Sequence, residues 1–251
     1  MQWSYSRVST YEQCPYKYKL RYIDRLKVLP ELIPTNPLIL GKALHTALEL
    51  GVDAGAQEYL KSYPIAETEH FTELMKLDIV IPAARELLPV GGEYEIKVSN
   101  EHFVSYIDYL FPVGGEVYDI YDFKYSNNAA LYMESWQLHL YKYFFERINP
   151  GKTVRNLYYL MVPKTKAKQK KNESVMQYRV RILEELSRLK PALIEIAYNP
   201  LKVRDFSKTI LEVLEAETFP KKHNSLCYFC DFARYCGSEG KINYNILEVK
   251  K

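Results

Sequence analysis

The stretch VYDIYDFKYS, residues 117–126, indicates a buried strand that carries charge. Its valine, isoleucine and aromatic residues are typical of strands. Because successive side chains of a strand point to opposite faces, Asp122 and Lys124 share one face and Asp119 lies on the other. A surface pair of this kind contributes only about 0.2 to 1 kcal/mol. The stretch by itself therefore fits an ion pair on an exposed strand as well as a functional site.

The apolar runs around this stretch predict an antiparallel meander, since the last two are joined by the turn PVGG at residues 112–115. Helical periodicity precedes and follows the meander, which predicts an α/β fold with a central mixed sheet flanked by helices. The expected strands are 93–99, 102–111, 116–126, 154–162 and 174–182, and the expected helices are 6–22 (broken at Pro15), 40–50, 67–88, 131–148, 183–197 and 205–217.

Composition places the chain among folded proteins without a membrane segment. It has 251 residues, of which 47% are hydrophobic, enough for a sizeable core. No run of about 18 apolar residues and no secretory signal is found, so we expect a cytoplasmic protein with no membrane partner. A net charge of +3 does not by itself indicate a nucleic-acid partner. Five lysines between Lys164 and Lys171 predict an exposed, mobile hairpin tip.

Three carboxylates are expected to converge near Lys124. Asp108 lies near the end of the preceding strand and can reach Asp122 across the hairpin, while Glu95 lies one strand earlier. Such carboxylates repel one another unless a cation is present, and oxygen ligands favour Mg²⁺ or Mn²⁺. A lysine beside that cation could orient or deprotonate a water, or neutralise charge on a phosphate. Together these groups could carry out metal-assisted hydrolysis of a phosphodiester. The glutamate of the group could be Glu93 instead of Glu95, because the two lie on the same face of the strand.

Four cysteines suggest a second metal site. Cys227, Cys230 and Cys236 form CxxCxxxxxC, and Cys14 lies 213 positions before Cys227. Disulfides are rare in the cytosol, so the thiols fit either zinc or a 4Fe-4S cluster, and spacing alone does not choose between them. Four unrelated buried thiols are the remaining alternative.

The order of these motifs resembles the PD-(D/E)xK nucleases, in particular the branch that contains the RecB and AddB nuclease domains and the iron-sulfur exonucleases associated with CRISPR adaptation. That branch shows GxxxH, a glutamate, GxxD, DxK and QxxxY. Ser105 departs from the pattern, because the branch usually has glycine there. The matching segments here are GKALH ending at His45, EYEIKV with Glu95, SYID with Asp108, DFK with Asp122 and Lys124, and WQLHLY with Gln137 and Tyr141.

The resemblance implies roles for these residues. The metal would be surrounded by His45, Glu95, Asp108, Asp122 and the carbonyl of Phe123, and Lys124 would assist the attacking water. Gln137 and Tyr141, one helical turn apart, would brace the site or contact DNA. A single histidine on an apolar helix is also often a hydrogen-bonded core residue.

For the cysteines the resemblance favours a structural 4Fe-4S cluster, because Cys14 stands in QCPYKYKLRY, like the cysteine-proline helix of that branch. The implied architecture is one nuclease domain, residues 1–251. A restriction-endonuclease-like core would span 39–199. The cluster would join two helical parts, 1–38 and 200–240.

The implied function is metal-dependent exonuclease action on DNA ends or single strands, in recombination, repair, CRISPR adaptation or viral DNA processing. The protein would then be associated with the nucleoid or encoded by a virus. No GxxxxGK[ST] motif is present, so a helicase would have to be a partner protein. The alternative is a non-catalytic or zinc-stabilised nucleic-acid-binding protein.

Overall fold

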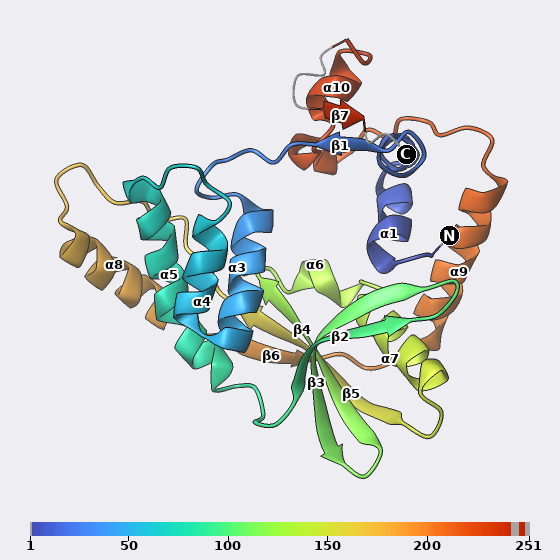
Figure 1. Ribbon diagram of the computed structural model, residues 1–251, viewed down its shortest axis with the longest axis horizontal. Coiled ribbons are helices and arrows are strands. Elements are labelled where there is room, and N and C mark those ends of the chain that lie inside the picture. The colour runs from blue at the N-terminus through green and yellow to red at the C-terminus, as the bar shows by residue number, and fades with distance from the viewer. Residues whose placement is uncertain (1, 242–245, 249–251) are drawn as a thin grey trace. The chain divides into compact units, whose positions relative to one another are not determined.

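The computed structural model describes residues 2–241 and 246–248. The expected domain 1–251 also includes residues 1, 242–245 and 249–251, which lie outside the described part of the chain. The chain divides into two compact units (Figure 1). Unit 1 comprises Met1–Glu31, Ser99–Ser105 and Asn199–Lys251, and unit 2 comprises Leu32–Val98 and Tyr106–Tyr198.

Unit 2 is built on a mixed five-stranded sheet, in the order β2-β3-β4-β5-β6 (Figure 1). Strand β4 pairs antiparallel with β3 and parallel with β5, and β6 pairs antiparallel with β5. The strands are β2 (Glu93–Ser99), β3 (Val104–Gly114), β4 (Val117–Tyr125), β5 (Thr153–Val162) and β6 (Ala192–Glu195). The stretch quoted at the outset is thus the central strand of the sheet.

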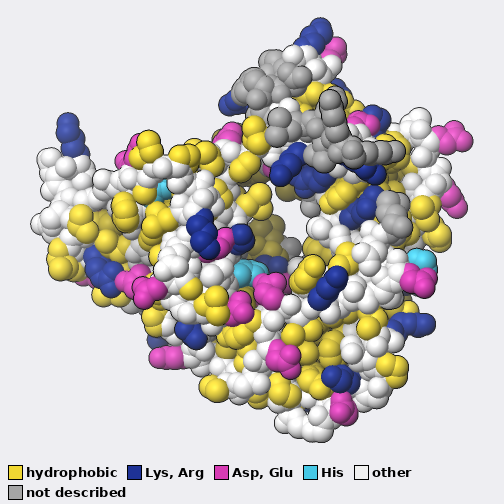
Figure 2. Space-filling model, in the orientation of Figure 1, with side chains coloured by type: hydrophobic (Ala, Val, Ile, Leu, Met, Phe, Trp, Pro, Cys, Tyr) yellow, Lys and Arg dark blue, Asp and Glu magenta, His cyan; other side chains and the backbone are white. Residues whose placement is uncertain are grey.

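Helices cover both faces of this sheet, which confirms the predicted α/β fold. Tyr121 and Phe123 of β4 pack in one apolar cluster with α3 (Pro37–Leu50), α4 (Val52–Leu60), α5 (Thr68–Arg85) and α8 (Val175–Ser187). Ile120 of β4 and Tyr159 of β5 pack in a second cluster with α7 (Gln137–Ile148). Each fully buried aliphatic or aromatic side chain contributes roughly 1.5–3 kcal/mol, so the two clusters fix β4 from both sides. Figure 2 shows hydrophobic side chains interspersed with charged ones over α3, α4, α5 and α8.

Helix α3 has clear local causes. The side chain of Asn36 accepts hydrogen bonds from the backbone N–H groups of Leu38 and Ile39, and Pro37 occupies the first helical position. The helix ends at Gly51, whose φ of +102° suits glycine. These ends set the phase of the helix and so the direction in which His45 points.

Two predictions for the second half of unit 2 are wrong. Residues 174–182 were expected as a strand, but they form the first part of α8. Residues 183–197 were expected as a helix, but α8 ends at Ser187 and β6 follows at Ala192–Glu195. The lysine-rich segment therefore connects a strand to a helix and is not a hairpin tip.

The predicted helix 131–148 is interrupted. It consists of α6 (Ala130–Met133) and α7, separated by residues 134–136. Helix α4 was not predicted as a separate element. It follows α3 directly after Gly51, and Gly55 lies close to Ala47 of α3, where a Cβ atom would stand 2.5 Å from the Ala47 Cβ.

Unit 1 combines the two ends of the chain. As predicted, the first helical region divides at Pro15. Strands β1 (Leu26–Val28) and β7 (Ile246–Glu248) pair antiparallel, and Leu20 packs with Phe232 in a small apolar cluster. The helices are α1 (Tyr5–Gln13), α2 (Pro15–Tyr18), the π-helical turn η1 (Lys19–Ile23), α9 (Pro200–Glu215), the 3-10 turn η2 (Ser225–Phe229) and α10 (Ala233–Gly237). Within the described residues, none of the helices has the length and apolar character needed to cross a bilayer.

Candidate metal centre and active site

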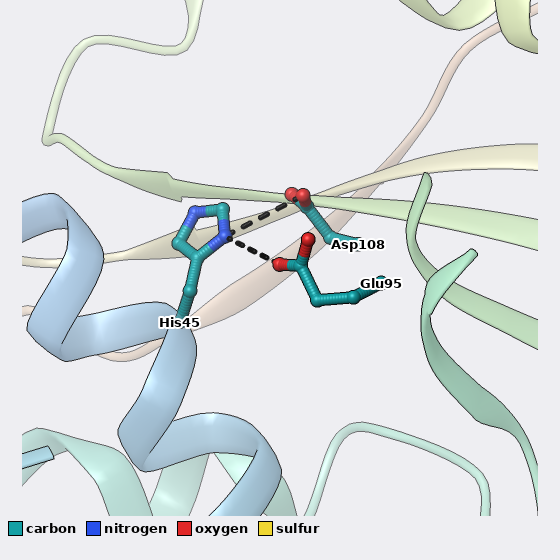
Figure 3. A group of neighbouring side chains, drawn as sticks. All are labelled: His45, Glu95 and Asp108. Carbon is teal, nitrogen blue, oxygen red and sulfur yellow. Dashed lines mark ion pairs between the residues drawn. The ribbon is translucent and has the colours of Figure 1, made fainter. Parts of the chain in front are cut away.

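Three side chains from three elements of unit 2 converge at one point (Figure 3). The Nδ1 atom of His45, on α3, lies 3.4 Å from Oδ1 of Asp108, on β3, and 3.7 Å from Oε1 of Glu95, on β2. One ligand atom from each residue lies within 4.8 Å of the others. An imidazole nitrogen and two carboxylate oxygens suit Mn²⁺ or Mg²⁺, so this group could hold a divalent cation.

Glu95 reaches the group through an unusual backbone conformation. Its φ is +53°, in the left-handed region that side chains other than glycine rarely adopt. Among the described residues, Glu93 has no such conformation and is not part of the group. Strain of this kind is concentrated at functional sites. No local signal in the sequence indicates it.

Proton affinities in the group are coupled by charge. Burial is the largest cause that raises the pKa of Asp108 to about 7, and the neighbouring Asp122 carboxylate adds to it. Burial alone would lower the pKa of His45, but its hydrogen bond to Glu95 and the charges of Asp108 and Asp122 raise it above the ordinary value. Without a metal, Asp108 and His45 therefore bind protons more tightly than the same groups do in water.

Asp122 and Lys124 lie side by side on β4. Asp122 is 1% exposed, and its Oδ2 forms an ion pair with Nζ of Lys124. Nζ also donates to Oε1 of Gln137 on α7 at 3.0 Å, and Nε2 of Gln137 donates to the hydroxyl of Tyr141 at 2.7 Å. Four of the predicted site residues thus form one chain of polar contacts between the sheet and α7.

Two aromatic residues that the sequence did not single out complete the surroundings of Lys124. Its ammonium lies 5.4 Å from the ring centre of Tyr132, on α6, and 5.5 Å from that of Tyr159, on β5. Burial alone would lower the pKa of Lys124, but Asp122 raises it above the ordinary value. Its ion pair with Asp122 therefore favours the charged form of the Lys124 ammonium. Tyr132 could have been found only by recognising the helix break after Met133.

A backbone hydrogen bond links the group of His45, Glu95 and Asp108 to β4, the strand that carries Asp122 and Lys124. The N–H of Phe123 donates to Oδ2 of Asp108 at 2.6 Å, which leaves Oδ1 of Asp108 toward His45. Asp119 is separate. It is buried, and its carboxylate accepts from the guanidinium of Arg155 and from the N–H of Asn156. Its role is structural, as its position on the opposite face of β4 indicates.

The four cysteines belong to unit 1. The backbone N–H of Lys222 donates to the sulfur of Cys14 at 3.5 Å, and the backbone N–H of Asn224 donates to the sulfur of Cys227 at 3.5 Å. Burial raises the pKa of Cys230, and the nearby Cys14 adds to it.

Comparison with known proteins gives a family. The model of the PD-(D/E)XK nuclease superfamily matches residues 2–237. Among solved structures, the chain is similar to a crystal structure from Eubacterium rectale named "Putative exonuclease", with 13% identity, 93% of this chain and 87% of that chain covered, and a TM-score of 0.53. The structure of SSO0001 aligns at 13% identity over 94% of this chain and 86% of that one, with a TM-score of only 0.40.

Comparison with curated proteins finds no significant match. At 13% identity the Eubacterium rectale structure shows a shared fold and not a shared activity. The family model spans nearly the whole chain, including both the carboxylate group and the cysteines. This protein therefore belongs to the PD-(D/E)XK nuclease superfamily.

Proposed function

We propose that this nuclease is a metal-dependent DNA exonuclease that acts on DNA ends or single strands. The observation that carries the proposal is the convergence of His45, Glu95 and Asp108 beside the Asp122–Lys124 pair. Members of the superfamily usually use divalent metals, and the donor atoms here suit Mg²⁺ or Mn²⁺. The family supports DNA as the substrate, and the name of the Eubacterium rectale protein supports exonuclease action.

The proposed roles follow from position and charge. His45, Glu95, Asp108 and Asp122 would hold the metal with the Phe123 carbonyl, and the metal would supply Lewis acidity and an acidified water. Lys124, held by Asp122 and Gln137, would assist the attacking water or stabilise negative charge on the phosphate. Gln137 and Tyr141 would brace Lys124, because Tyr141 is buried and bonded to Gln137.

The test uses end-labelled single- and double-stranded DNA with Mg²⁺, with Mn²⁺ and with EDTA. With the native protein we expect the labelled strand to shorten stepwise from its end, and only when metal is present. For Asp122→Asn and for Lys124→Ala we expect kcat to fall on the order of 10²-fold or more. Asp119→Asn is the matched control, since it makes the same change three positions away, on the opposite face of β4. Equal rates for native protein and both site variants would contradict the assignment, and internal cuts in circular single strands would indicate an endonuclease.

We further propose that the protein belongs to the RecB/AddB-like branch and that Cys14, Cys227, Cys230 and Cys236 bind a structural 4Fe-4S cluster. The order of the motifs supports the branch. The position of all four cysteines in unit 1 and the N–H groups directed at the sulfurs of Cys14 and Cys227 support the cluster. The cluster would join the helical parts 1–38 and 200–240 to a core at 39–199 in one domain. Recombination, repair, CRISPR adaptation and viral DNA processing are the proposed settings, with a helicase or recombination protein as partner.

A further inference from the structure

Two large aromatic side chains stand in solvent next to each other in unit 1. Tyr228 is 87% exposed and Phe229 is 78% exposed. Their ring centres are 5.0 Å apart, with the planes at 81°. Aromatic side chains usually bury 150–250 Å² each. An adjacent pair that remains exposed to water is therefore a candidate binding surface.

The turn that presents this pair is anchored at its base. The side chain of Asn224 accepts from the N–H of Leu226 at 2.9 Å and donates to the carbonyl of Gln13 on α1 at 3.1 Å. The N–H of Cys230 donates to the carbonyl of Cys227 at 3.2 Å, which closes the turn around the two rings. The rings are therefore offered on a fixed turn and lose little freedom on binding.

Charge indicates what the pair would bind. By sequence, unit 1 has 15 basic and 11 acidic residues, whereas unit 2 has 19 basic and 20 acidic residues. The positive excess of the protein therefore lies in the unit that carries the exposed rings. Asp231, the acid nearest to them in sequence, is neutralised by its ion pair with Arg21. Lys221 and Lys222 precede the turn in the sequence, and their ammonium groups donate to the backbone carbonyls of Cys236 and Glu12. Exposed aromatic faces on a positively charged unit are the elements with which proteins bind single-stranded nucleic acid.

We infer that Tyr228 and Phe229 form a stacking platform for the bases of single-stranded DNA. The inference rests on the proposed function for the identity of the nucleic acid. Stacking is tolerant of sequence because every base has a π face, which suits an enzyme that must process any strand. The platform would bind the strand by its bases, while basic residues of unit 1 contact phosphates.

The test measures binding of a fluorescein-labelled oligothymidylate to the full-length protein in EDTA by fluorescence anisotropy. A second probe has the same length and the same phosphates but abasic sugars. We expect Tyr228→Ala and Phe229→Ala each to weaken binding of the oligothymidylate about 5- to 150-fold. Binding of the abasic probe should not change, and the dependence of affinity on salt should keep its slope, since no phosphate contact is removed.

Three further variants guard against trivial explanations. Leu226→Ala removes an exposed apolar side chain from the same turn, and Tyr106→Ala removes an exposed aromatic one from β3; each is 50% exposed, and neither should alter affinity. Phe229→Trp should keep the affinity of the native protein, because it preserves a π face. A Phe229→Ala protein that fails to fold would show in circular dichroism, and Phe229→Trp then still decides.

The inference is overturned if both probes lose affinity equally or if neither does. It is also overturned if Tyr228→Ala with Phe229→Ala abolishes self-association of the native protein in sedimentation velocity and leaves DNA affinity intact, since a second copy would then be the occupant. Cleavage that depends on Asp122 and Lys124, together with unaltered binding in the platform variants, leaves the proposed function standing without the platform. If the protein binds the oligothymidylate through its bases but does not cleave DNA, the platform stands and the proposed function does not.

Discussion

At the scale of single residues, Glu95 joins strain and charge in one position. Its left-handed backbone costs about 1–3 kcal/mol, and its carboxylate faces that of Asp108 around His45. Glu95→Gly removes the backbone strain, because glycine adopts positive φ freely. It also removes the ion pair with His45, which contributes little because the Glu95 carboxylate is half exposed. We expect the free energy of unfolding of the metal-free protein to rise by about 1 kcal/mol and Mn²⁺ binding to weaken, measured by urea unfolding and by calorimetric titration.

The matched control for that substitution is Glu93→Gly. Glu93 is exposed, lies on the same strand and does not share the positive φ. Glycine in an ordinary strand position costs roughly 0.5–1 kcal/mol, so this variant should be less stable than the native protein and should bind Mn²⁺ equally well. If Glu93→Gly rather than Glu95→Gly weakens Mn²⁺ binding, Glu93 is the ligand.

Protonation makes the metal group sensitive to pH. The pKa of Asp108 is raised to about 7, and that of His45 is raised above its ordinary value. Both residues bind protons more tightly in the folded state, so the metal-free protein should lose stability as pH rises from about 4 through 7. Metal ligation needs the deprotonated forms, so Mn²⁺ affinity should increase over the same rise and protons should be released.

The measurement is the melting temperature at pH 6 and pH 8, with and without Mn²⁺. Stabilisation by Mn²⁺ should be larger at pH 8. Asp108→Asn should remove most of the fall in metal-free stability between these pH values. A Mn²⁺ effect that is the same at both pH values would contradict the proposed coupling.

At the scale of elements, α8 shows how a local signal can outweigh apolar alternation. The segment SVMQYRVRI has the valine content and alternation of a strand, yet it begins with a capping box. The hydroxyl of Ser174 accepts from the N–H of Gln177 at 3.2 Å, and the amide of Gln177 accepts from the N–H of Ser174 at 2.8 Å. The S-x-x-Q pattern is therefore the signal that could have identified the helix.

Removing this cap tests the assignment. Ser174→Ala should lower the free energy of unfolding by about 0.5–2 kcal/mol, because the N–H of Gln177 loses its acceptor at the start of α8. Ser187→Ala is the control at the other end of the helix, where the hydroxyl donates only to the carbonyl of Glu184 on the surface. Chemical unfolding compares the two, and equal stability of both variants would argue against the cap.

At the scale of the whole molecule, Cys14 and Cys227 lie 213 positions apart in the chain. A cluster bound there would restrict the unfolded chain over a very long loop, and ligand binding would be coupled to folding. We expect anaerobically purified protein to be brown, with absorbance near roughly 400 nm from thiolate-to-iron charge transfer. Cys14→Ser should lose that colour and melt at a lower temperature.

Metal analysis distinguishes the alternatives for this site. Iron and acid-labile sulfide in equal amounts support the cluster. A colourless protein with stoichiometric zinc would contradict it and favour the zinc-stabilised alternative. Cys236→Ser, at the other end of the chain, should reproduce the effect of Cys14→Ser, because each cluster needs all its thiolates.

Much of the fold could be predicted because strand and helix patterns are local. The alternation in β4 predicted which face carries Asp122 and Lys124, and their contacts lie on the α7 side of the sheet as that pattern requires. Asp119 was correctly separated from them. The proline at position 15 was correctly predicted to divide the first helix.

Other features depend on contacts that no short segment encodes. Whether His45, on α3, meets Asp108, on β3, is decided by the packing of α3 on the sheet. The choice of Glu95 over Glu93 goes with the positive φ of Glu95, which Glu93 does not share. Tyr132 approaches Lys124 only because α6 and α7 are separate helices.

The sequence by itself determined the chemical inventory: an acid and a lysine on one strand face, further carboxylates on adjacent strands, a histidine upstream and four thiols at the two ends. It could do so because residue type and strand periodicity are local properties. Only the tertiary structure decided the distances within the group of His45, Glu95 and Asp108, and the raised pKa values of Lys124 and Asp108. The physical reason is that burial and Coulomb interaction depend on groups far apart in the chain being brought within a few ångströms.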